Sequence, residues 1–319
     1  MRVIPEEAMA ALVTPEDAMA AMRDAFAAMA RGAADNFPVV REALGGGRLY
    51  GFKSGIDRAG GVLGVKAGGY FPGNDARGLT NHQSAVLLFD PDTGRPVAML
   101  GGNLLTALRT AAAAALSVDL LARPDARVLG IVGAGHQSAF HLRAVARVRR
   151  FERVIAWNRD PARLDRLAQV AAELGLPFDA VPLARMTEAQ VIVTITSSPA
   201  ASLMAGHVAA GTHLACMGTD TRGKQEVEPQ LLARARIYTD AVAQSVTIGE
   251  AQHAVALGLI AAGDILPLGD VVTGRDAGRR GADEITLFDG TGVALQDLAV
   301  AALALRRAEA AGIGASVPF

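Results

Sequence analysis

The stretch RVLGIVGAGHQSAFHLRAVARVRRFERVIAWNR, residues 127–159, decides the fold of this chain. It begins with an apolar run at 128–132, which is typical of a parallel strand covered on both faces. The turn GAGHQS at 133–138 follows, and then about twelve residues that lack Gly and Pro and whose apolar residues have helical spacing. A second apolar run at 153–157 closes the unit. This order predicts a β-α-β unit in which a helix N-terminus faces a pyrophosphate.

The glycines of the turn have separate roles in this prediction. Gly133 permits a tight turn, and Gly135 lets the backbone approach phosphates without an intervening side chain. Ser138 stands where a third glycine is usual, so the fingerprint is incomplete. The complete β-α-β setting favours a dinucleotide site at Gly133, Ala134 and Gly135. The alternative is an ordinary strand-to-helix turn in a sheet that binds no nucleotide.

The bulk properties restrict the possible partners and compartment. The chain has 319 residues, a length typical of about two domains, and its net charge of −1 gives no reason to expect nucleic acid. The single cysteine, Cys216, excludes an intramolecular disulfide and fits a reducing cytosol. No secretory signal precedes the first helix, and the apolar run Ala111–Leu121 is too short to span a bilayer. We expect a soluble cytoplasmic protein that binds no membrane.

The rest of the chain divides into two patterns. Residues 6–31 predict two helices, and 38–100 predict short strands of a mixed or antiparallel sheet with a hairpin turn at 90–94. A long helix at 104–121 leads to the β-α-β unit. After it, helical and strand-like segments alternate at 161–174, 190–196, 213–218 and 236–241. An alanine-rich amphipathic helix at 293–311 ends the chain and can return to pack on the N-terminal domain.

The fold class we predict is therefore α/β, with a Rossmann-type doubly wound parallel sheet and a smaller α+β domain for substrate binding and dimerisation. The smaller domain takes residues 1–118 with 296–319, and the Rossmann domain takes 119–295. Methionine and alanine positions in the first helices indicate packing, including packing against a second subunit.

Ligands of such sheets bind at the carboxyl ends of the strands, where three polar segments fall. Asn158-Arg159 follows the second strand, where an acid normally accepts the ribose 2′-hydroxyl, and this replacement favours a 2′-phosphate and hence NADP. Thr196 follows the next strand and can contact the nicotinamide ribose. Asp220 follows a further strand. Its position alone favours a turn or cap residue over a catalytic residue. The less favoured alternative is that Arg159 is a solvated loop cation.

Two cations stand in apolar surroundings in the N-terminal part. Lys66 lies in the strand GVKAG, where it either reaches a surface or faces a cleft, since lysine is seldom fully buried without a partner. Arg109 lies on an apolar helix and forms either a structural ion pair or a clamp for a carboxylate, which its planar fork matches. The six histidines show no metal-ligand spacing, so we expect no metal.

Several motifs together resemble the ornithine cyclodeaminase/mu-crystallin family. They are KAGGYFPGN at 66–74, LTALRT at 105–110, the GAGHQS turn, GTD and GKQE at 218–226, and FDGTGVALQD at 288–297. The match runs in order from about residue 38 to the C-terminal helix and does not depend on the glycine turn. The resemblance implies a homodimer paired through the N-terminal domain, with NAD(P) on the Rossmann domain.

The resemblance also implies roles for individual residues. Arg41, Lys66 and Arg109 hold the α-carboxylate of the substrate, Asp220 is the acid or base at the reacting nitrogen, and Thr291 approaches substrate and nicotinamide. The residues that line the cofactor are Asn81, Arg109, His136, Gln137, Asn158, Arg159, Thr196, Met217 and Lys224.

Two departures from family patterns favour one reaction among the several that the family performs. The cyclodeaminases carry a glutamate thirteen residues before the lysine, and here that position is Lys53. A cation there repels the distal ammonium of ornithine and attracts a distal carboxylate, unless Lys53 faces solvent; inside a partly dry cleft this reversal is worth roughly several kcal/mol. The sequence WNR ending at Arg159 resembles that of NADPH-using mu-crystallins.

We therefore expect an NAD(P)H-dependent reductase of a small imino acid, with iminosuccinate, which gives L-aspartate, as the candidate substrate. NADPH is favoured slightly and NADH is not excluded. The alternatives are a deaminating cyclisation of ornithine, an alanine-type dehydrogenase, a cyclic ketimine reductase, and a crystallin-like protein that only binds NADPH and a small ligand. An intact set of Arg41, Lys66, Arg109 and Asp220 argues against mere binding.

Overall fold

The computed structural model describes all of residues 1–319, and they form two compact units. Unit 1 comprises Met1–Arg109 with Val293–Phe319, and unit 2 comprises Thr110–Gly292. Helix α3 (Asn103–Leu121) contributes residues to both units, and helix α10 (Ala294–Ala311) belongs to unit 1. The domain limits expected from the sequence, after residue 118 and before residue 296, fall inside these two helices.

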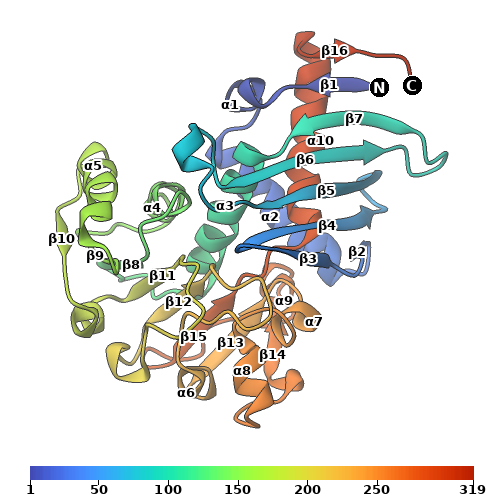
Figure 1. Ribbon diagram of the computed structural model, residues 1–319. Coiled ribbons are helices and arrows are strands. Elements are labelled where there is room, and N and C mark those ends of the chain that lie inside the picture. The colour runs from blue at the N-terminus through green and yellow to red at the C-terminus, as the bar shows by residue number, and fades with distance from the viewer. The chain divides into compact units, whose positions relative to one another are not determined.

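Unit 1 is built on a mixed sheet, as expected (Figure 1). The strand order is β16-β1-β7-β6-β5-β4-β2, with β3 also paired to β4. Neighbouring strands are antiparallel except β1 and β7, which are parallel. The strands are β1 (Arg2–Ile4), β2 (Ala34–Asn36), β3 (Val40–Gly45), β4 (Arg48–Asp57), β5 (Val62–Tyr70), β6 (His82–Phe89), β7 (Pro96–Gly101) and β16 (Ala315–Ser316).

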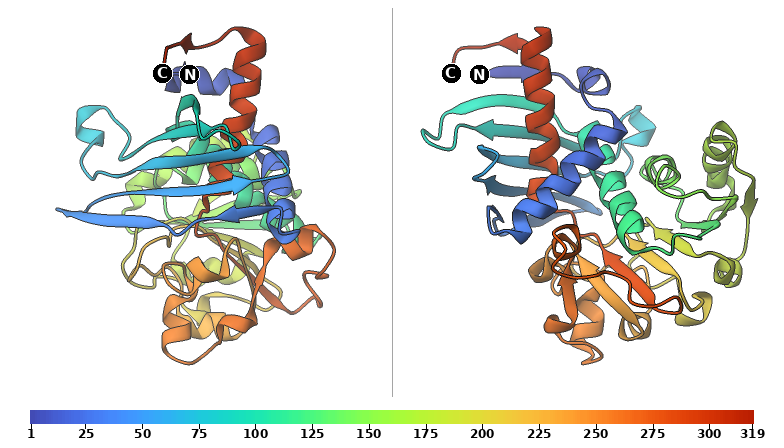
Figure 2. Two further views of the ribbon diagram at one scale, coloured as in Figure 1. Left: turned by 90° about the vertical axis from the view of Figure 1, so that its right-hand side faces the viewer. Right: turned by 180° about the vertical axis from the view of Figure 1, so that it is seen from behind.

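Helix α10 lies across one face of this sheet and contacts β4, β5 and β6, with α2 (Pro15–Ala30) packed beside it (Figure 2). The approach is close: a Cβ on Gly64 of β5 would lie 2.7 Å from Leu298 of α10. Helix α2 begins at a capping box between Thr14 and Asp17. The first expected helix is only a 3-10 turn (Glu6–Ala8) and the four-residue α1 (Met9–Leu12), without a side-chain cap. A second 3-10 turn, η2, spans Asp75–Arg77.

Unit 2 contains a parallel sheet in the order β10-β9-β8-β11-β12-β15-β13-β14. Every pairing in it is parallel. The chain leaves β8 first toward β9 and β10 and later toward β11 and β12, so the sheet is doubly wound, as predicted. The strands are β8 (Val128–Val132), β9 (Arg153–Trp157), β10 (Phe178–Ala180), β11 (Val191–Thr194), β12 (His213–Cys216), β13 (Ala235–Thr239), β14 (Ile265–Pro267) and β15 (Ile285–Asp289).

Short helices connect these strands. They are α4 (Ser138–Val145), α5 (Asp165–Glu173), α6 (Pro229–Ala233), α7 (Val242–Ser245), α8 (Ala251–Ala256) and α9 (Leu268–Val272), with 3-10 turns η3 (Pro161–Leu164), η4 (Leu183–Glu188), η5 (Ala205–His207) and η6 (Ala262–Asp264). The central strands are almost wholly buried, and Cys216 belongs to their core. The reversal of strand order between β8 and β11 marks where a ligand of such a sheet binds.

One helix passes a simple test for a membrane span. Helix α3 is long and apolar enough to cross a bilayer by length and composition alone. However, 83% of its most apolar window is buried inside the protein, as in the core helix of a folded domain.

Candidate functional site

The glycine turn after β8 has the geometry that a dinucleotide needs. Gly133 adopts a φ of +109°, and a Cβ there would lie 2.5 Å from the carbonyl oxygen of Ile195, so a larger residue cannot replace it. A Cβ on Gly135 would meet nothing within 4 Å, so open space adjoins the backbone at this position. Helix α4 begins without a side-chain cap; the Ser138 N–H donates to the carbonyl oxygen of Gly135, and the next N–H groups of the first turn are left for a ligand.

The departure at Ser138 has a local explanation. The Ser138 hydroxyl donates to the carbonyl oxygen of Gly135 at 2.7 Å, so the side chain folds back into the turn and is buried. Next to it, Gln137 Oε1 is buried with no hydrogen-bond partner. A buried acceptor without a donor is costly, and a ligand with a hydrogen-bond donor would satisfy it. These features fit a nicotinamide dinucleotide on this turn.

The residues after β9 have two different environments. Asn158 Oδ1 accepts a hydrogen bond from the Ala134 N–H at 3.1 Å, and its Nδ2 donates to the carbonyl oxygen of Asp160 at 2.8 Å. Asn158 therefore shapes the glycine turn. Arg159 is exposed and has no ion-pair partner within the protein, so its guanidinium can contact a phosphate. His136 is also exposed, and burial of part of its ring lowers its pKa.

The loops after β11 and β12 are joined by one buried carboxyl group, that of Glu226. Its Oε1 accepts from the Thr196 N–H at 2.5 Å, and its Oε2 accepts from the Gly218 N–H at 2.8 Å. The loops pack so closely that a Cβ on Gly218 would lie 2.3 Å from the carbonyl oxygen of Thr196. Met217, in the same loop, is nearly buried. The structure thus brings Thr196 and Met217 together at the carboxyl ends of neighbouring strands.

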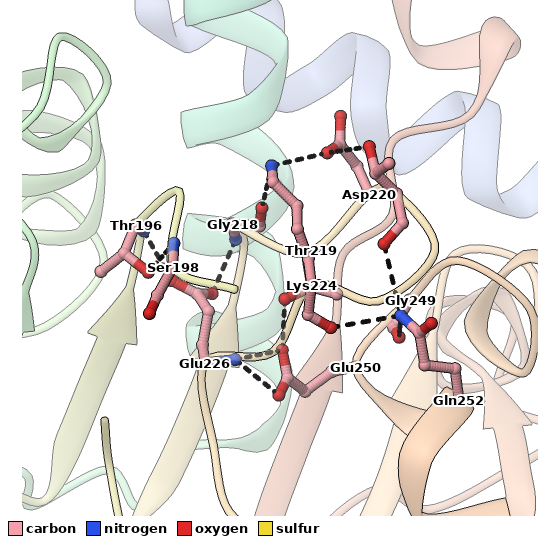
Figure 3. A network of polar contacts seen from close by, with 11 residues as sticks. Thr196, Ser198, Gly218, Thr219, Asp220, Lys224, Glu226, Gly249, Glu250 and Gln252 are labelled. Carbon is pink, nitrogen blue, oxygen red and sulfur yellow. Dashed lines mark hydrogen bonds and ion pairs between the residues drawn. The ribbon is translucent and has the colours of Figure 1, made fainter. Parts of the chain in front are cut away.

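Asp220 lies in a loop beyond β12 that hydrogen bonds and an ion pair hold in place (Figure 3). Lys224 Nζ is 3.0 Å from Asp220 Oδ1 and donates to the carbonyl oxygen of Gly218 at 3.1 Å. Gln252 Oε1, on α8, accepts from the Gly223 N–H at 2.8 Å. The carboxyl group of Asp220 is about one-third exposed, so it is held in place while remaining reachable by a ligand.

Thr291 occupies a tight turn after β15. Its hydroxyl donates to Asp240 Oδ1 at 2.6 Å, and the Gly292 N–H donates to Asp240 Oδ2 at 2.6 Å. Thr291 is buried, and in this structure its hydroxyl stabilises the turn through Asp240. Asn81 has a comparable local role in unit 1, because its carbonyl oxygen accepts from the Phe71 N–H at 2.7 Å.

Unit 1 carries a cluster of cations on the sheet face that α10 covers. Lys53 of β4 lies directly opposite Lys66 of β5, and Arg41 of β3 lies opposite Gly51, two residues before Lys53. Since alternate residues of a strand share a face, Arg41, Lys53 and Lys66 point to the same side. Lys53 is only 6% exposed, so the reading in which it faces solvent is wrong.

Lys66 and Arg109 share one carboxylate. Asp297, in the first turn of α10, places Oδ1 3.0 Å from Lys66 Nζ and 2.9 Å from Arg109 Nε. Arg109 Nη1 also donates to Gln296 Oε1 at 2.8 Å, and Lys66 Nζ donates to Thr106 Oγ1 at 3.1 Å. Arg109 therefore forms the structural ion pair that was one of its two expected roles. Lys66 is buried, so the alternative in which it reaches the protein surface is wrong.

Burial and charge set the pKa values in this cluster. Burial lowers the pKa of Lys66 to about 8, with Asp297 raising it and Arg109 and Arg41 lowering it further. Asp297 is fully buried, which raises its pKa, but the neighbouring Arg109, Lys66 and Lys53 outweigh burial and hold that pKa below its usual range. A cluster whose lysine is near its titration point responds strongly to an added anion.

Comparison with known proteins places this chain in a family. The model of the ornithine cyclodeaminase/mu-crystallin family matches residues 5–312. The chain belongs to that family. It is 60% identical to the iminosuccinate reductase of Paracoccus denitrificans, over 99% of each chain. The crystal structure of that reductase in complex with NAD+ superposes with a TM-score of 0.95 at 59% identity, covering 100% of this chain and 99% of the other.

An archaeal alanine dehydrogenase dimer with bound NAD has the same fold. It superposes with a TM-score of 0.95 at 31% identity and covers 100% of this chain and 99% of the other. The α/β fold predicted from the sequence is thus confirmed by solved members of the family.

Sequence reasoning gave no role to several acids that organise the site. Asp297 and Glu226 lay within quoted motifs, while Asp240 and Glu250 were not considered. Each is buried in the structure. Glu226, Asp240 and Glu250 accept hydrogen bonds from backbone N–H groups, a role too frequent among acids to be decisive in a sequence, whereas Asp297 pairs with two cations. No three His, Cys, Asp or Glu side chains gather as a metal site.

Proposed function

We propose that this protein is an NAD(P)H-dependent reductase that converts iminosuccinate into L-aspartate. The observation that carries the proposal is the charge balance of the cation cluster. The buried charged side chains of unit 1 are Lys53, Lys66, Arg109 and Asp297, three cations and one anion. An excess of buried positive charge makes the local electrostatic potential positive, so this region favours a ligand with two negative charges, as a dicarboxylate has.

The relatives support the same chemistry. The Paracoccus denitrificans relative is an iminosuccinate reductase, and the identity of 60% extends over nearly the whole of both chains. Lys53, where the cyclodeaminases have glutamate, disfavours ornithine as a substrate because it would repel the distal ammonium of ornithine. The other reactions of the family are distinguished by measuring activity with their own substrates.

We assign roles to the residues of each unit. In unit 1, Arg41, Lys66 and Arg109 bind the α-carboxylate and Lys53 binds the distal one. In unit 2, the dinucleotide is held by the glycine turn and by Gln137, Asn158, Arg159, Thr196, Met217 and Lys224. NAD(P)H supplies the hydride. Asp220 stabilises the iminium nitrogen by charge or relays its proton, and Thr291 approaches the substrate and the nicotinamide.

The choice between the two nicotinamide cofactors is part of the proposal. Two solved relatives hold NAD, which supports NADH. The exposed, unpaired Arg159 supports NADPH, because a guanidinium can bind a 2′-phosphate bidentately. We retain NADPH as the cofactor favoured by the sequence and expect NADH to be used as well.

We also propose a homodimer formed through the sheet of unit 1. Tyr50, Phe52 and Met99 lie on the sheet face opposite the cations, and each is more than two-fifths exposed. Apolar side chains gathered on one open sheet face mark a surface for association. The archaeal relative is described as a dimer, which supports the same proposal. A cytoplasmic location stays a prediction from the sequence.

The test follows nicotinamide absorbance with NADH and with NADPH. The substrates are oxaloacetate with ammonium, pyruvate with ammonium, and pyrroline-2-carboxylate. We expect fast oxidation with oxaloacetate and ammonium, and we expect Lys53→Glu to abolish it. Arg95→Glu, the same charge change at an exposed position of unit 1, is the matched control and should keep full activity.

Three results would reject the proposal. A preference for pyrroline-2-carboxylate, unaffected by Lys53→Glu, would make the protein a cyclic imine reductase. Ammonia release from ornithine without net oxidation of cofactor would make it a cyclodeaminase. If alanine substitutions at Lys66 and Asp220 left every detectable activity intact, the protein would be a binding protein of the crystallin kind.

A further inference from the structure

Glu226 receives hydrogen bonds from two loops at once. Besides the N–H groups of Thr196 and Gly218, its Oε2 accepts from the Thr194 hydroxyl at 2.7 Å. Thr194 ends β11, and Gly218 follows β12 by two residues. One side chain of fixed length therefore determines how far apart the two strand ends can lie. The residue is 1% exposed, so its carboxyl group is shielded from bulk solvent.

The backbone of Glu226 is itself held by a second acid, Glu250 (Figure 3). The N–H groups of Glu226 and Val227 donate to Glu250 Oε1 at 2.9 and 2.8 Å, and the Thr219 hydroxyl donates to Oε2 at 2.5 Å. Glu250 thus joins the loop that carries Asp220 to the segment that carries Glu226.

Two neighbouring buried carboxyl groups carry a cost in desolvation and in mutual repulsion, so they are an unfavourable means of stabilising a fold. Burial raises the pKa of both, and the proximity of Glu226 helps to raise the pKa of Glu250 to about 8. The three hydrogen bonds of the Glu226 side chain are all accepted from backbone N–H or hydroxyl donors at the carboxyl ends of β11 and β12, the edge where such sheets bind ligands. The arrangement fits a role in loop geometry better than a role in stability.

We propose that Glu226 is a positioning residue that fixes the spacing of the loops at 195–198 and 217–220, and through them the placement of the nicotinamide and of Asp220. This inference rests on the proposed function, because the relation of these loops to the nicotinamide comes from it. Lys224 strengthens the link, since its ammonium group contacts both Gly218 and Asp220.

The test is Glu226→Gln, which keeps the shape and replaces one acceptor oxygen by an NH2 group. That group must face the N–H of Thr196 or the donors at Gly218 and Thr194, so at least one hydrogen bond is lost and two donors oppose each other. We expect the dissociation constant of NADH, measured by nicotinamide fluorescence, to rise about tenfold and kcat to fall at least about tenfold. The inhibition constant of succinate, which probes the cations of unit 1, should stay within about twofold of wild type.

The matched control is Thr212→Val. The buried Thr212 hydroxyl donates to the carbonyl oxygen of Ala189 at 3.2 Å, before the start of β12 and away from its carboxyl end. This variant also loses a buried hydrogen bond, and it should lower the melting temperature without changing NADH binding. If NADH binding weakened equally in both variants, or stayed unchanged in Glu226→Gln, a positioning role would be excluded.

A second variant covers the case in which Glu226→Gln does not fold. Thr194→Val removes only one donor to Oε2, and we expect it to weaken NADH binding about threefold in the same direction. No change there would overturn the proposal. NADH binding is measured without substrate, so a protein that binds NADH but reduces no imine would refute the proposed function while still testing Glu226.

Discussion

Replacing Asp297 by asparagine tests the electrostatics of the cation cluster most directly. Asp297 Oδ1 lies 3.0 Å from Lys66 Nζ and is the main group that raises the pKa of this lysine. At an effective dielectric constant of about 20, unit charges about 4 Å apart interact by about 4 kcal/mol, and one pKa unit corresponds to about 1.4 kcal/mol. Allowing for relaxation, we expect Asp297→Asn to lower the pKa of Lys66 by about one to three units.

The sign of the effect on binding follows from the protonated state. Lys66 attracts an anion only while it carries its proton, and in the wild type the pKa of Lys66 is about 8. Affinity for a dicarboxylate should therefore be constant below pH 8 and fall as pH rises through that value. In Asp297→Asn the fall should begin at least about one pH unit lower, so that binding at neutral pH is already weakened.

The assay is the inhibition constant of succinate as a function of pH. Succinate resembles the substrate, and both of its carboxylates stay ionised across the range of interest, so that changes in affinity report the enzyme. Lys66→Arg supplies the control: its guanidinium keeps its charge, and the alkaline fall should disappear. If Asp297→Asn weakened binding equally at every pH, Asp297 would only shape the site, and our electrostatic reasoning would be refuted.

Three further predictions concern the cofactor, stability and assembly. Arg159→Ala should lower kcat/KM with NADPH about tenfold and leave that with NADH within about twofold, which steady-state kinetics with both cofactors would show. Burial raises the pKa of Glu250 to about 8 and of Asp289 to about 7. Above the unfolded pKa values the folded state therefore binds more protons than the unfolded state, and the urea midpoint of unfolding should fall as pH rises from about 5 to about 8. A midpoint that did not change with pH would contradict these shifts. Phe52→Asp should convert the proposed dimer into monomers in sedimentation experiments, whereas Arg95→Glu should not.

The parallel sheet could be predicted because its signals are local. The apolar runs at 128–132 and 153–157 and the glycine turn between them each reflect an interaction within a few residues. The requirement for glycine at 133 is strict, since any side chain would meet the backbone of Ile195. For the same reason the carboxyl ends of these strands could be located to within two residues, and Asn158, Thr196 and Asp220 follow the ends of β9, β11 and β12 in turn.

The partners of the site residues could not be predicted, because they come from distant parts of the chain. Lys66 and Asp297 are separated by 231 positions in the sequence. The Glu226 N–H donates to the Glu250 carboxyl group, and no short sequence pattern predicts this contact. Periodicity leaves open whether a lysine in a strand faces solvent, and only the helix α10 packed over the sheet buries Lys53. The role of Ser138 was also hidden, because a hydroxyl folded into a turn looks the same in sequence as an incomplete fingerprint.

The charge balance of unit 1 also bears on how the protein discriminates between substrates. The three cations and one anion leave an excess of two positive charges among the buried side chains. A monocarboxylate offsets one of them and a dicarboxylate offsets both, so a monocarboxylic imine such as that of pyruvate should bind more weakly. Either anion stabilises the protonated form of Lys66, whose pKa is about 8, so both imines should lose affinity as pH rises through that value. The two substrates should therefore differ in affinity and not in the sign of their pH dependence.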